Sequence, residues 1–194
     1  MNKFVFIPLL SFFMGGVSVS AQEFHGATLY DAVGPVEEIQ IDTKNPFVYF
    51  STAKFTPNGK ANGAYLTYTL SYDADGYPSG FDMKNGNSYA FMKIVYDKAN
   101  RPDSIVIDSN LMEAYLNVTV ANSYDSKGIL VGRTIAKTLN DNKRSYRFSY
   151  SNIVNDDHGN WVSRSVVQEE TGGAQPSKKE YVEKRTIKYY TGGK

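Results

Sequence analysis

The chain has 194 residues, with 21 Lys and Arg, 20 Asp and Glu, and no Cys. This balance of charge removes the electrostatic basis for nucleic acid or an anionic membrane as a main partner. The absence of Cys excludes disulfides and the lipid anchor that bacterial lipoproteins carry on a Cys, so the fold must depend on its packed core.

The first 21 residues have the composition of a secretory signal peptide. A positive start that ends at Lys3 precedes an apolar stretch over 4–19, and small residues up to Ala21 permit cleavage before Gln22. The stretch is too short to span a membrane, and we expect no transmembrane segment in the mature chain. We therefore predict a cleaved leader over 1–21 and a single exported domain over 22–194, located in the periplasm, at the cell surface or outside the cell. Without Lys3 the Lys and Arg number 20, which equals the number of acidic residues.

Five short segments repeat one pattern, in which Tyr or Asn precedes Asp and a short gap leads to Gly or Asn. They lie at 30–34, 72–76, 96–100, 124–128 and 155–159, and 55–59 is a looser copy. Asp is favoured at the first position of a type I turn, and Gly or Asn accepts the left-handed backbone that closes a hairpin with a bulge. Each copy therefore predicts a strand, a turn and a second strand. The predicted turn residues are Asp31, Gly34, Gly59, Asp73, Gly76, Asp97, Asn100, Asp125, Gly128, Asp156 and Gly159.

Alternation of apolar and polar residues predicts strands along the chain, and no helix of useful length is expected. Residues 88–96 are apolar on both faces apart from Lys93, so we predict a central strand that is covered on both sides. Consecutive hairpins form an antiparallel meander. The predicted fold is therefore all-β, with a sheet that twists and rolls into an open barrel-like or two-layer shape. The other predicted strands lie at 35–42, 46–55, 64–72, 101–108, 111–124, 129–137, 145–150, 161–168 and 180–190.

These copies resemble the YD-repeat family, the β-repeat proteins that include rearrangement-hotspot proteins and teneurins. The pattern D-x-G-N-W-x-x-R at 157–164, followed by R-x-I-x-Y-Y at 185–190, looks like the ending of small secreted YD-repeat-like proteins of Gram-negative bacteria. The resemblance covers about residues 30 to 190. It departs at Asn100, which replaces a Gly, at Asn155, which replaces a Tyr, and at 55–59, which lacks Tyr-Asp. The resemblance implies a hairpin-built sheet, export, and no established catalytic machinery in the repeats.

Few residues suit catalysis. His25 lies near the predicted mature N-terminus and His158 inside a predicted turn, and no G-x-S-x-G motif supports a Ser/His/Asp site. A glycosidase needs two facing carboxylates, but adjacent residues of a strand point to opposite faces. We therefore predict no catalytic residues and no enzyme. The adjacent acidic pairs are Glu37/Glu38, Asp156/Asp157 and Glu169/Glu170.

Metal and ligand motifs are also scarce. The oxygen-rich turns at 73–76 and 155–157 lack the twelve-residue loop and the distant Glu of an EF-hand, and we predict no metal and no cofactor. The single Trp, Trp161, is a candidate sugar platform, but we favour a structural seal that packs the last hairpin into the core. The 15 Tyr are typical of half-exposed sheet faces, with a sugar- or protein-binding surface as the alternative.

The sequence thus predicts an exported, non-enzymatic β-repeat protein of the bacterial envelope that binds or scaffolds. The expected partner is an unknown glycan or envelope protein, contacted through a Tyr-rich face. Two alternatives stay open. One is a polysaccharide-acting hydrolase that uses carboxylates from different repeats, and the other is a purely structural envelope subunit that assembles through its terminal strands.

Overall fold

Strands make up most of the structure, which confirms the predicted all-β class. The computed structural model describes residues 23–45, 51–62, 70–111, 114–171 and 176–191, so the predicted leader lies outside the described residues. Within these segments no helix has the length and apolar character needed to cross a bilayer. The described elements are the 3-10 helix η1 (Gly26–Tyr30) and the strands β1 (Val36–Asp42), β2 (Thr52–Phe55), β3 (Ala61–Asn62), β4 (Ser71–Tyr72), β5 (Pro78–Asn85), β6 (Ser88–Tyr96), β7 (Pro102–Leu111), β8 (Ala114–Tyr124), β9 (Leu130–Leu139), β10 (Asn142–Asn155), β11 (Trp161–Thr171) and β12 (Ser177–Tyr189).

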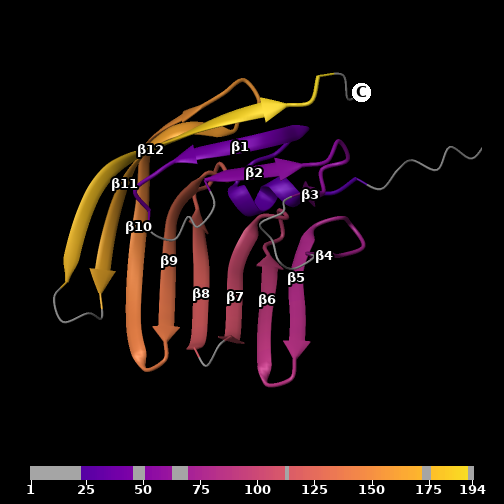
Figure 1. Cartoon of the computed structure of the whole chain (residues 1–194). Coiled ribbons are helices and arrows are strands. Elements are labelled where there is room, and N and C mark those ends of the chain that lie inside the picture. The colour runs from indigo at the N-terminus through magenta and orange to yellow at the C-terminus, as the bar shows by residue number, and fades with distance from the viewer. Residues whose placement is uncertain (1–22, 46–50, 63–69, 112–113, 172–175, 192–194) are drawn as a thin grey trace, which may run out of the picture.

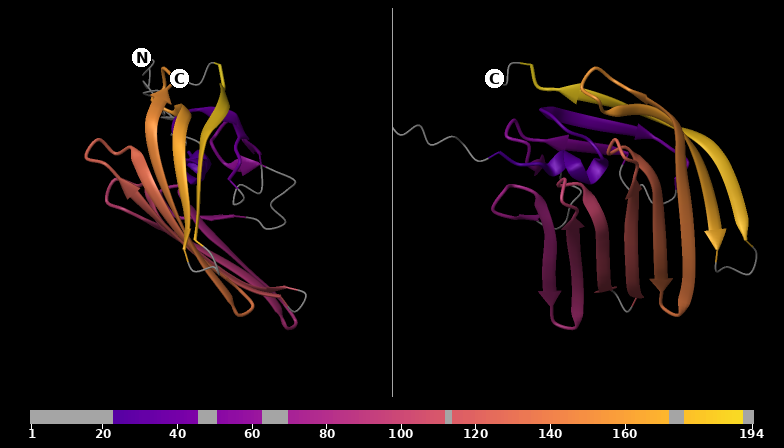
Figure 2. Two further views of the ribbon diagram at one scale, coloured as in Figure 1. Left: turned by 90° about the vertical axis from the view of Figure 1, so that its left-hand side faces the viewer. Right: turned by 180° about the vertical axis from the view of Figure 1, so that it is seen from behind.

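The twelve strands form one antiparallel sheet in the order β3-β2-β1-β12-β11-β10-β9-β8-β7-β6-β5-β4. The predicted meander is therefore confirmed, with one addition: β1 pairs with β12, so the first and last strands lie side by side (Figure 1). The described sheet does not close into a barrel, because β3 and β4 remain as its two edges. Seen edge-on, β1–β3 and η1 lie on one side of the other strands (Figure 2). We call that side the inner face of the sheet and the opposite side the outer face.

Five turns of one geometry connect β2 to β3, β4 to β5, β6 to β7, β8 to β9 and β10 to β11, and we call them the consensus turns. In each turn the carbonyl oxygen of the first residue accepts a hydrogen bond from the N–H of the residue three positions later. The N–H of the first residue donates to the carbonyl oxygen of the residue four positions later. In four of the turns an Asp carboxylate also accepts two backbone N–H bonds, and in the first turn the Thr56 hydroxyl accepts one from Lys60. The residues at the fourth position all have positive φ: Gly59, Gly76, Asn100, Gly128 and Gly159.

A bulge follows four of the consensus turns and gives the sheet its curvature. The register shifts by one residue at the pairs that contain Tyr72, Tyr96, Tyr124 and Asn155, because the returning strand carries an extra residue each time. A bulge bends its strand and increases the local twist. The strand β10 carries a second shift, between Ser151 and Val154, and belongs to the strands that curve most in Figure 1.

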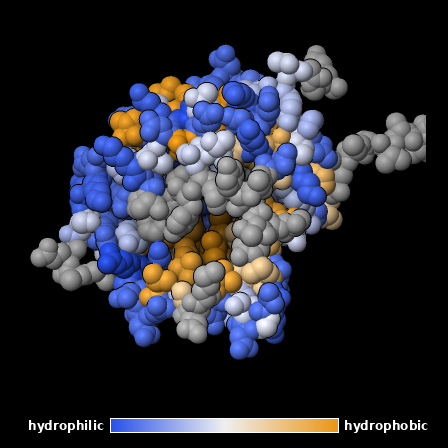
Figure 3. Space-filling model, in the orientation of Figure 1, coloured by the Kyte–Doolittle hydropathy of each residue, from blue (hydrophilic) through white to orange (hydrophobic). Residues whose placement is uncertain are grey.

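Side chains alternate between the two faces of the sheet. Ile135 and Phe148 on the inner face are 4% and 1% exposed, and hydrophobic side chains gather in a hollow on this side (Figure 3). The expectation that residues 88–96 are covered on both sides is wrong. Ile94 is buried, but Phe91 and Val95 on the outer face are 37% and 42% exposed. The prediction failed because apolar residues on an open face have the same sequence pattern as residues covered by a second layer.

Two hydrophobic clusters hold the inner face together. One cluster joins the N-terminal segment to β1 and β2, and it consists of Ala27, Ala32, Val36, Ile39 and Phe55. The other lies over the central strands, and it consists of Leu130, Ile135, Phe148, Tyr150 and Val166. The core therefore forms between the rolled ends of a single sheet, since the N-terminal elements fold back over the strands that follow them.

Tyrosines tie successive hairpins together. The hydroxyl of Tyr96 donates to the Pro78 oxygen at 2.8 Å, and that of Tyr124 donates to the Pro102 oxygen at 2.9 Å. Tyr72 accepts a bond from the Ala61 N–H at 2.9 Å. In all three cases the Tyr stands directly before a consensus turn and its partner is the fifth residue after the start of the preceding turn. The repeated Tyr therefore has a structural use between repeats.

Candidate functional site: the cavity at the consensus turns

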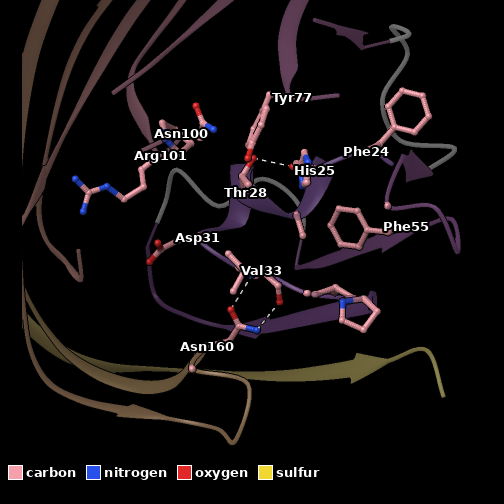
Figure 4. A pocket seen from close by; sticks show the side chains of 18 of the residues that line it. Phe24, His25, Thr28, Asp31, Val33, Phe55, Tyr77, Asn100, Arg101 and Asn160 are labelled. Atoms are coloured by element: carbon pink, nitrogen blue, oxygen red, sulfur yellow. Dashed lines mark hydrogen bonds between the residues drawn. The ribbon is translucent and has the colours of Figure 1, made fainter. Parts of the chain in front are cut away.

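The consensus turns all lie at the end of the sheet that faces η1, where a cavity of about 640 Å3 opens between them and the N-terminal segment (Figure 4). The segment 23–36 forms one wall, and the turns after β2, β6, β8 and β10 supply much of the rest. The sequence predicted the turns separately. The meander brings them together, because every second connection of a meander falls at the same end of its sheet.

The segment 30–34 is not a turn of this kind, although it carries the same residue pattern. Gly26–Tyr30 is helical, and Asp31 ends that helix with φ 53° and ψ 50°, donating its N–H to the Thr28 oxygen. Gly34 has φ +89° and lies just before β1. The difference arises because the helix η1, and not a strand, leads directly into Asp31, so there is no hairpin at this position for the turn to close. Asp31 and Gly34 instead shape the wall of the cavity.

The carboxylates of the consensus turns contribute to stability. We expect Asp125→Ala to lower the free energy of unfolding by about 1–2 kcal/mol, because the Lys127 and Ile129 amides lose their acceptor. Urea denaturation measures this change. Asp75→Ala removes an exposed turn carboxylate that accepts none of the described hydrogen bonds, and it should change stability by no more than about 0.5 kcal/mol. Equal effects of the two substitutions would contradict the assigned role of Asp125.

Long-range polar contacts fix the N-terminal wall of the cavity. The Asn160 side chain accepts the Val33 N–H at 2.8 Å and donates to the Val33 oxygen at 2.9 Å (Figure 4). Arg185 donates to the oxygens of Tyr30 and Asp31 at 2.5 and 2.9 Å. These contacts join residues that are more than 120 positions apart in the chain, so the wall exists only in the fully folded sheet.

The same segment also bridges the two open edges of the sheet. Phe24 and Gly26 donate their N–H groups to the oxygens of Asn58 and Gly59, in the turn beside the edge strand β3. His25, between them, donates to the Gly76 oxygen in the turn beside the edge strand β4. We call residues 23–26 the clasp.

The cavity contains charges of both signs. Asp31 and Arg101 lie on the same side of it (Figure 4). Arg101 forms an ion pair with Asp97 at 2.6 Å. The hydrogen bonds that the Arg101 guanidinium donates to the Asp97 carboxylate lower the pKa of that carboxyl. Burial raises the pKa of Tyr124 to about 12, and the negative charge of Asp31 adds to the rise. Among the described residues the Asp31 carboxylate has no hydrogen-bond or ion-pair partner, so it remains available to a ligand.

A stack of buried aromatic and cationic side chains includes Arg185, which bonds the N-terminal wall of the cavity. Trp161 is 6% exposed, and its ring lies between the guanidinium groups of Arg164 and Arg185, at 3.9 and 4.0 Å. Arg164 also contacts the Tyr150 ring at 3.7 Å and forms a buried ion pair with Glu183 at 2.7 Å. Burial lowers the pKa of Arg185 to about 10. The predicted seal residue therefore lies inside the molecule, where it does not offer an exposed platform to a sugar.

Sequence reasoning gave no role to Arg164, Glu183 or Arg185. Arg164 ends the pattern D-x-G-N-W-x-x-R, and Arg185 begins the pattern R-x-I-x-Y-Y. The occurrence of an Arg together with aromatic residues in both patterns was the sequence signal that could have indicated their contact. Glu183 gave no signal, because a Glu in an alternating strand is normally exposed.

The two histidines each stack on a Tyr ring, and His25 does so within the lining of the cavity. The imidazole of His25 stacks on Tyr77 at 4.2 Å, and that of His158 stacks on Tyr189 at 3.8 Å. In the acidic pair Glu169/Glu170, Glu170 bonds Arg144 on the inner face while Glu169 points to the outer face. Within the described segments no three His, Asp or Glu side chains are grouped so that they could hold a metal ion.

Comparison of the chain with protein-family models, with curated proteins and with solved structures gives no significant match.

Proposed function

We propose that the chain is an exported, non-enzymatic β-repeat protein of the bacterial envelope that binds a glycan or protein ligand in the cavity at the consensus turns. The observation that carries this proposal is the cavity itself, which combines about 640 Å3 of space with the Asp31 carboxylate, a group that forms no hydrogen bond or ion pair with the described residues. Ligand sites are concave and place a few polar groups at fixed positions. The wall is also rigidly held, because Asn160 and Arg185 bond its backbone.

The chemistry of the lining suits a polar, uncharged or mixed-charge ligand. Asp31 offers an acceptor, while Asn100, Arg101 and Lys127 on the consensus turns offer donors. Sugar hydroxyls and peptide backbone groups both pair with such a set. The Tyr-rich face that the sequence suggested receives less support, because several Tyr hydroxyls are bonded inside the sheet.

Thermal unfolding against a panel of glycans and envelope peptides tests the proposal. A ligand at about a hundred times its Kd should add about 2.7 kcal/mol to the stability of the folded state and raise the midpoint visibly. We expect Asp31→Asn to abolish this ligand-induced rise, since Asn also tolerates positive φ and keeps the backbone.

The matched control is Asp75→Asn, an exposed turn residue outside the cavity lining, which should leave the rise intact. A ligand shift that survives Asp31→Asn would place the site elsewhere. No shift across the panel would favour the structural subunit, and turnover of a glycan would favour the hydrolase.

A further inference from the structure

The inner face of the sheet carries an apolar surface toward the hairpin ends that lie away from the consensus turns. The described elements η1 and β1–β3 lie over the other end of the long strands (Figure 1), and hydrophobic side chains gather in a hollow on this side (Figure 3). A contiguous and partly exposed apolar surface marks a place that contacts a ligand or partner. Six partly exposed inner-face side chains on four adjacent strands form what we call the apolar trough: Phe81, Met83, Met92, Ile107, Leu116 and Val118.

One row of paired residues crosses the trough and ends in two cations. Residues that pair directly in an antiparallel sheet share a face, so the whole row belongs to the inner face. The row is apolar on its first four strands and basic on the next two. Its members, in order from β5 to β10, are Phe81, Met92, Ile107, Val118, Lys137 and Arg144.

The charge of Lys137 is not neutralised within the described part of the chain. Its side chain is half-buried, and it forms no hydrogen bond or ion pair with a described residue. Its direct neighbours across the strands are Val118 and Arg144, and Arg144 already pairs with Glu170 at 2.7 Å. Like charges placed directly opposite each other destabilise a sheet. Natural proteins break such local rules at functional sites, and an anion bound between the two cations would relieve the repulsion.

The geometry points to a ligand that is apolar along its length and anionic at one end. We propose that the trough binds a long-chain fatty acid, whose carboxylate lies at Lys137 and Arg144 and whose chain crosses the strands toward β5. This ligand is separate from the one proposed for the cavity at the consensus turns, because the trough lies toward the opposite ends of the strands.

The dimensions of the trough suit an acyl chain. Three intervals of about 4.8 Å separate β5 from β8, which gives a width of about 14 Å. An acyl chain in one leaflet of a bilayer spans half of the hydrocarbon core, about 15 Å. The trough also contains Met83 and Met92, whose flexible side chains adapt to the shape of a ligand.

Displacement of a fluorescent fatty acid by palmitate tests the proposal on the protein isolated from the periplasm of an expressing bacterium. We expect palmitate to bind with a Kd of about 10 μM or tighter. Octanoate has the same carboxylate on a shorter chain and should bind more weakly by at least about tenfold. Hexadecanol keeps the long chain without the negative charge and should also bind more weakly than palmitate.

Variants of one lysine on each face test the position of the carboxylate. Lys137→Gln should raise the Kd for palmitate about tenfold, because it removes a charge-assisted contact, and it should leave the Kd for hexadecanol unchanged. The matched control is Lys143→Gln, since Lys143 is exposed on the outer face, where it pairs with Thr138. This control should leave both Kd values unchanged.

Variants of two adjacent residues test the position of the chain. Met92→Gln puts a polar group into the trough and should weaken palmitate and hexadecanol alike by about tenfold. Phe91→Gln changes the next residue, which points to the outer face, and should have no effect on binding. If Met92→Gln lowers the melting temperature, Leu139→Gln replaces it, because Leu139 is 41% exposed on the inner face beside Lys137.

Four results would overturn the proposal. The first is no displacement by palmitate up to about 100 μM. The second is an equal loss of binding in Met92→Gln and Phe91→Gln, and the third is a Kd for palmitate that Lys137→Gln leaves unchanged. The fourth is displacement of the probe by an apolar peptide but not by palmitate, which would identify a protein as the partner of the trough.

Discussion

Glu183→Gln is expected to lower the free energy of unfolding by about 3–5 kcal/mol, because it leaves buried positive charge without its partner. Glu183 is 1% exposed, and one of its oxygens accepts the Nε–H of Arg164 at 2.8 Å. The other oxygen accepts the Thr43 hydroxyl at 2.7 Å. Without this carboxylate, the guanidinium groups of Arg164 and Arg185, which lie 3.9 and 4.0 Å from the centre of the Trp161 ring, have no ion-pair partner among the described residues. Urea unfolding at neutral pH measures the loss.

An exposed ion pair on the same sheet provides the control. Glu170 pairs with Arg144, whose side chain is 56% exposed, and we expect Glu170→Gln to cost no more than about 1 kcal/mol. The double variant Arg164→Met, Glu183→Leu should lose less stability than Glu183→Gln alone, since the buried charge of Arg164 is then removed together with that of its partner. If Glu183→Gln is as mild as Glu170→Gln, the ion pair is not important for stability.

Gly59→Ala should destabilise the protein by about 2–4 kcal/mol through the clasp. A Cβ on Gly59 would lie 1.9 Å from the Phe24 oxygen, and φ is +84°, so the substitution combines backbone strain with displacement of residues 23–26. Displacement of the clasp should break the hydrogen bonds that the Phe24 and Gly26 amides donate to Asn58 and Gly59. Denaturant unfolding gives the magnitude, and faster hydrogen exchange at the Gly26 amide should locate the change.

Gly159 supplies a matched comparison, because it holds the same turn position with φ +82° and a Cβ there would meet nothing within 4 Å. Gly159→Ala should therefore cost only the backbone strain, about 1–2 kcal/mol. The difference between the two variants measures the clasp. Equal losses would show that the clasp adds nothing to stability.

Most strands and turns were accessible from the sequence because their determinants are local, although β5 (Pro78–Asn85) and the short β3 (Ala61–Asn62) were not predicted. The range predicted at 88–96 matches β6, and 35–42, 161–168 and 180–190 fall within a few residues of β1, β11 and β12. Asp and Gly three residues apart specify a turn without outside help. The same local rule misled at Asp31, where the chain before the turn is helical and no hairpin exists.

The cavity and the buried stack could not be predicted, because they depend on contacts between distant parts of the chain. Asn160 meets Val33 across 127 positions, and Arg185 meets Tyr30 across 155. Nothing near these residues in sequence indicates their partners. The burial of Trp161 was predicted from its type, whereas the two arginines on its ring faces were not.

The pairing of β1 with β12 has a consequence for the order of folding. Hairpins from β5 to β10 join neighbouring segments and close short loops, which form fastest. The strand β1 is synthesised early, yet its partner β12 ends at Tyr189 and is synthesised last. Until then, β1 presents an unpaired edge that invites mispairing with other chains. The pairing of the N-terminal strands with the end of the sheet therefore cannot form until β12 has been synthesised.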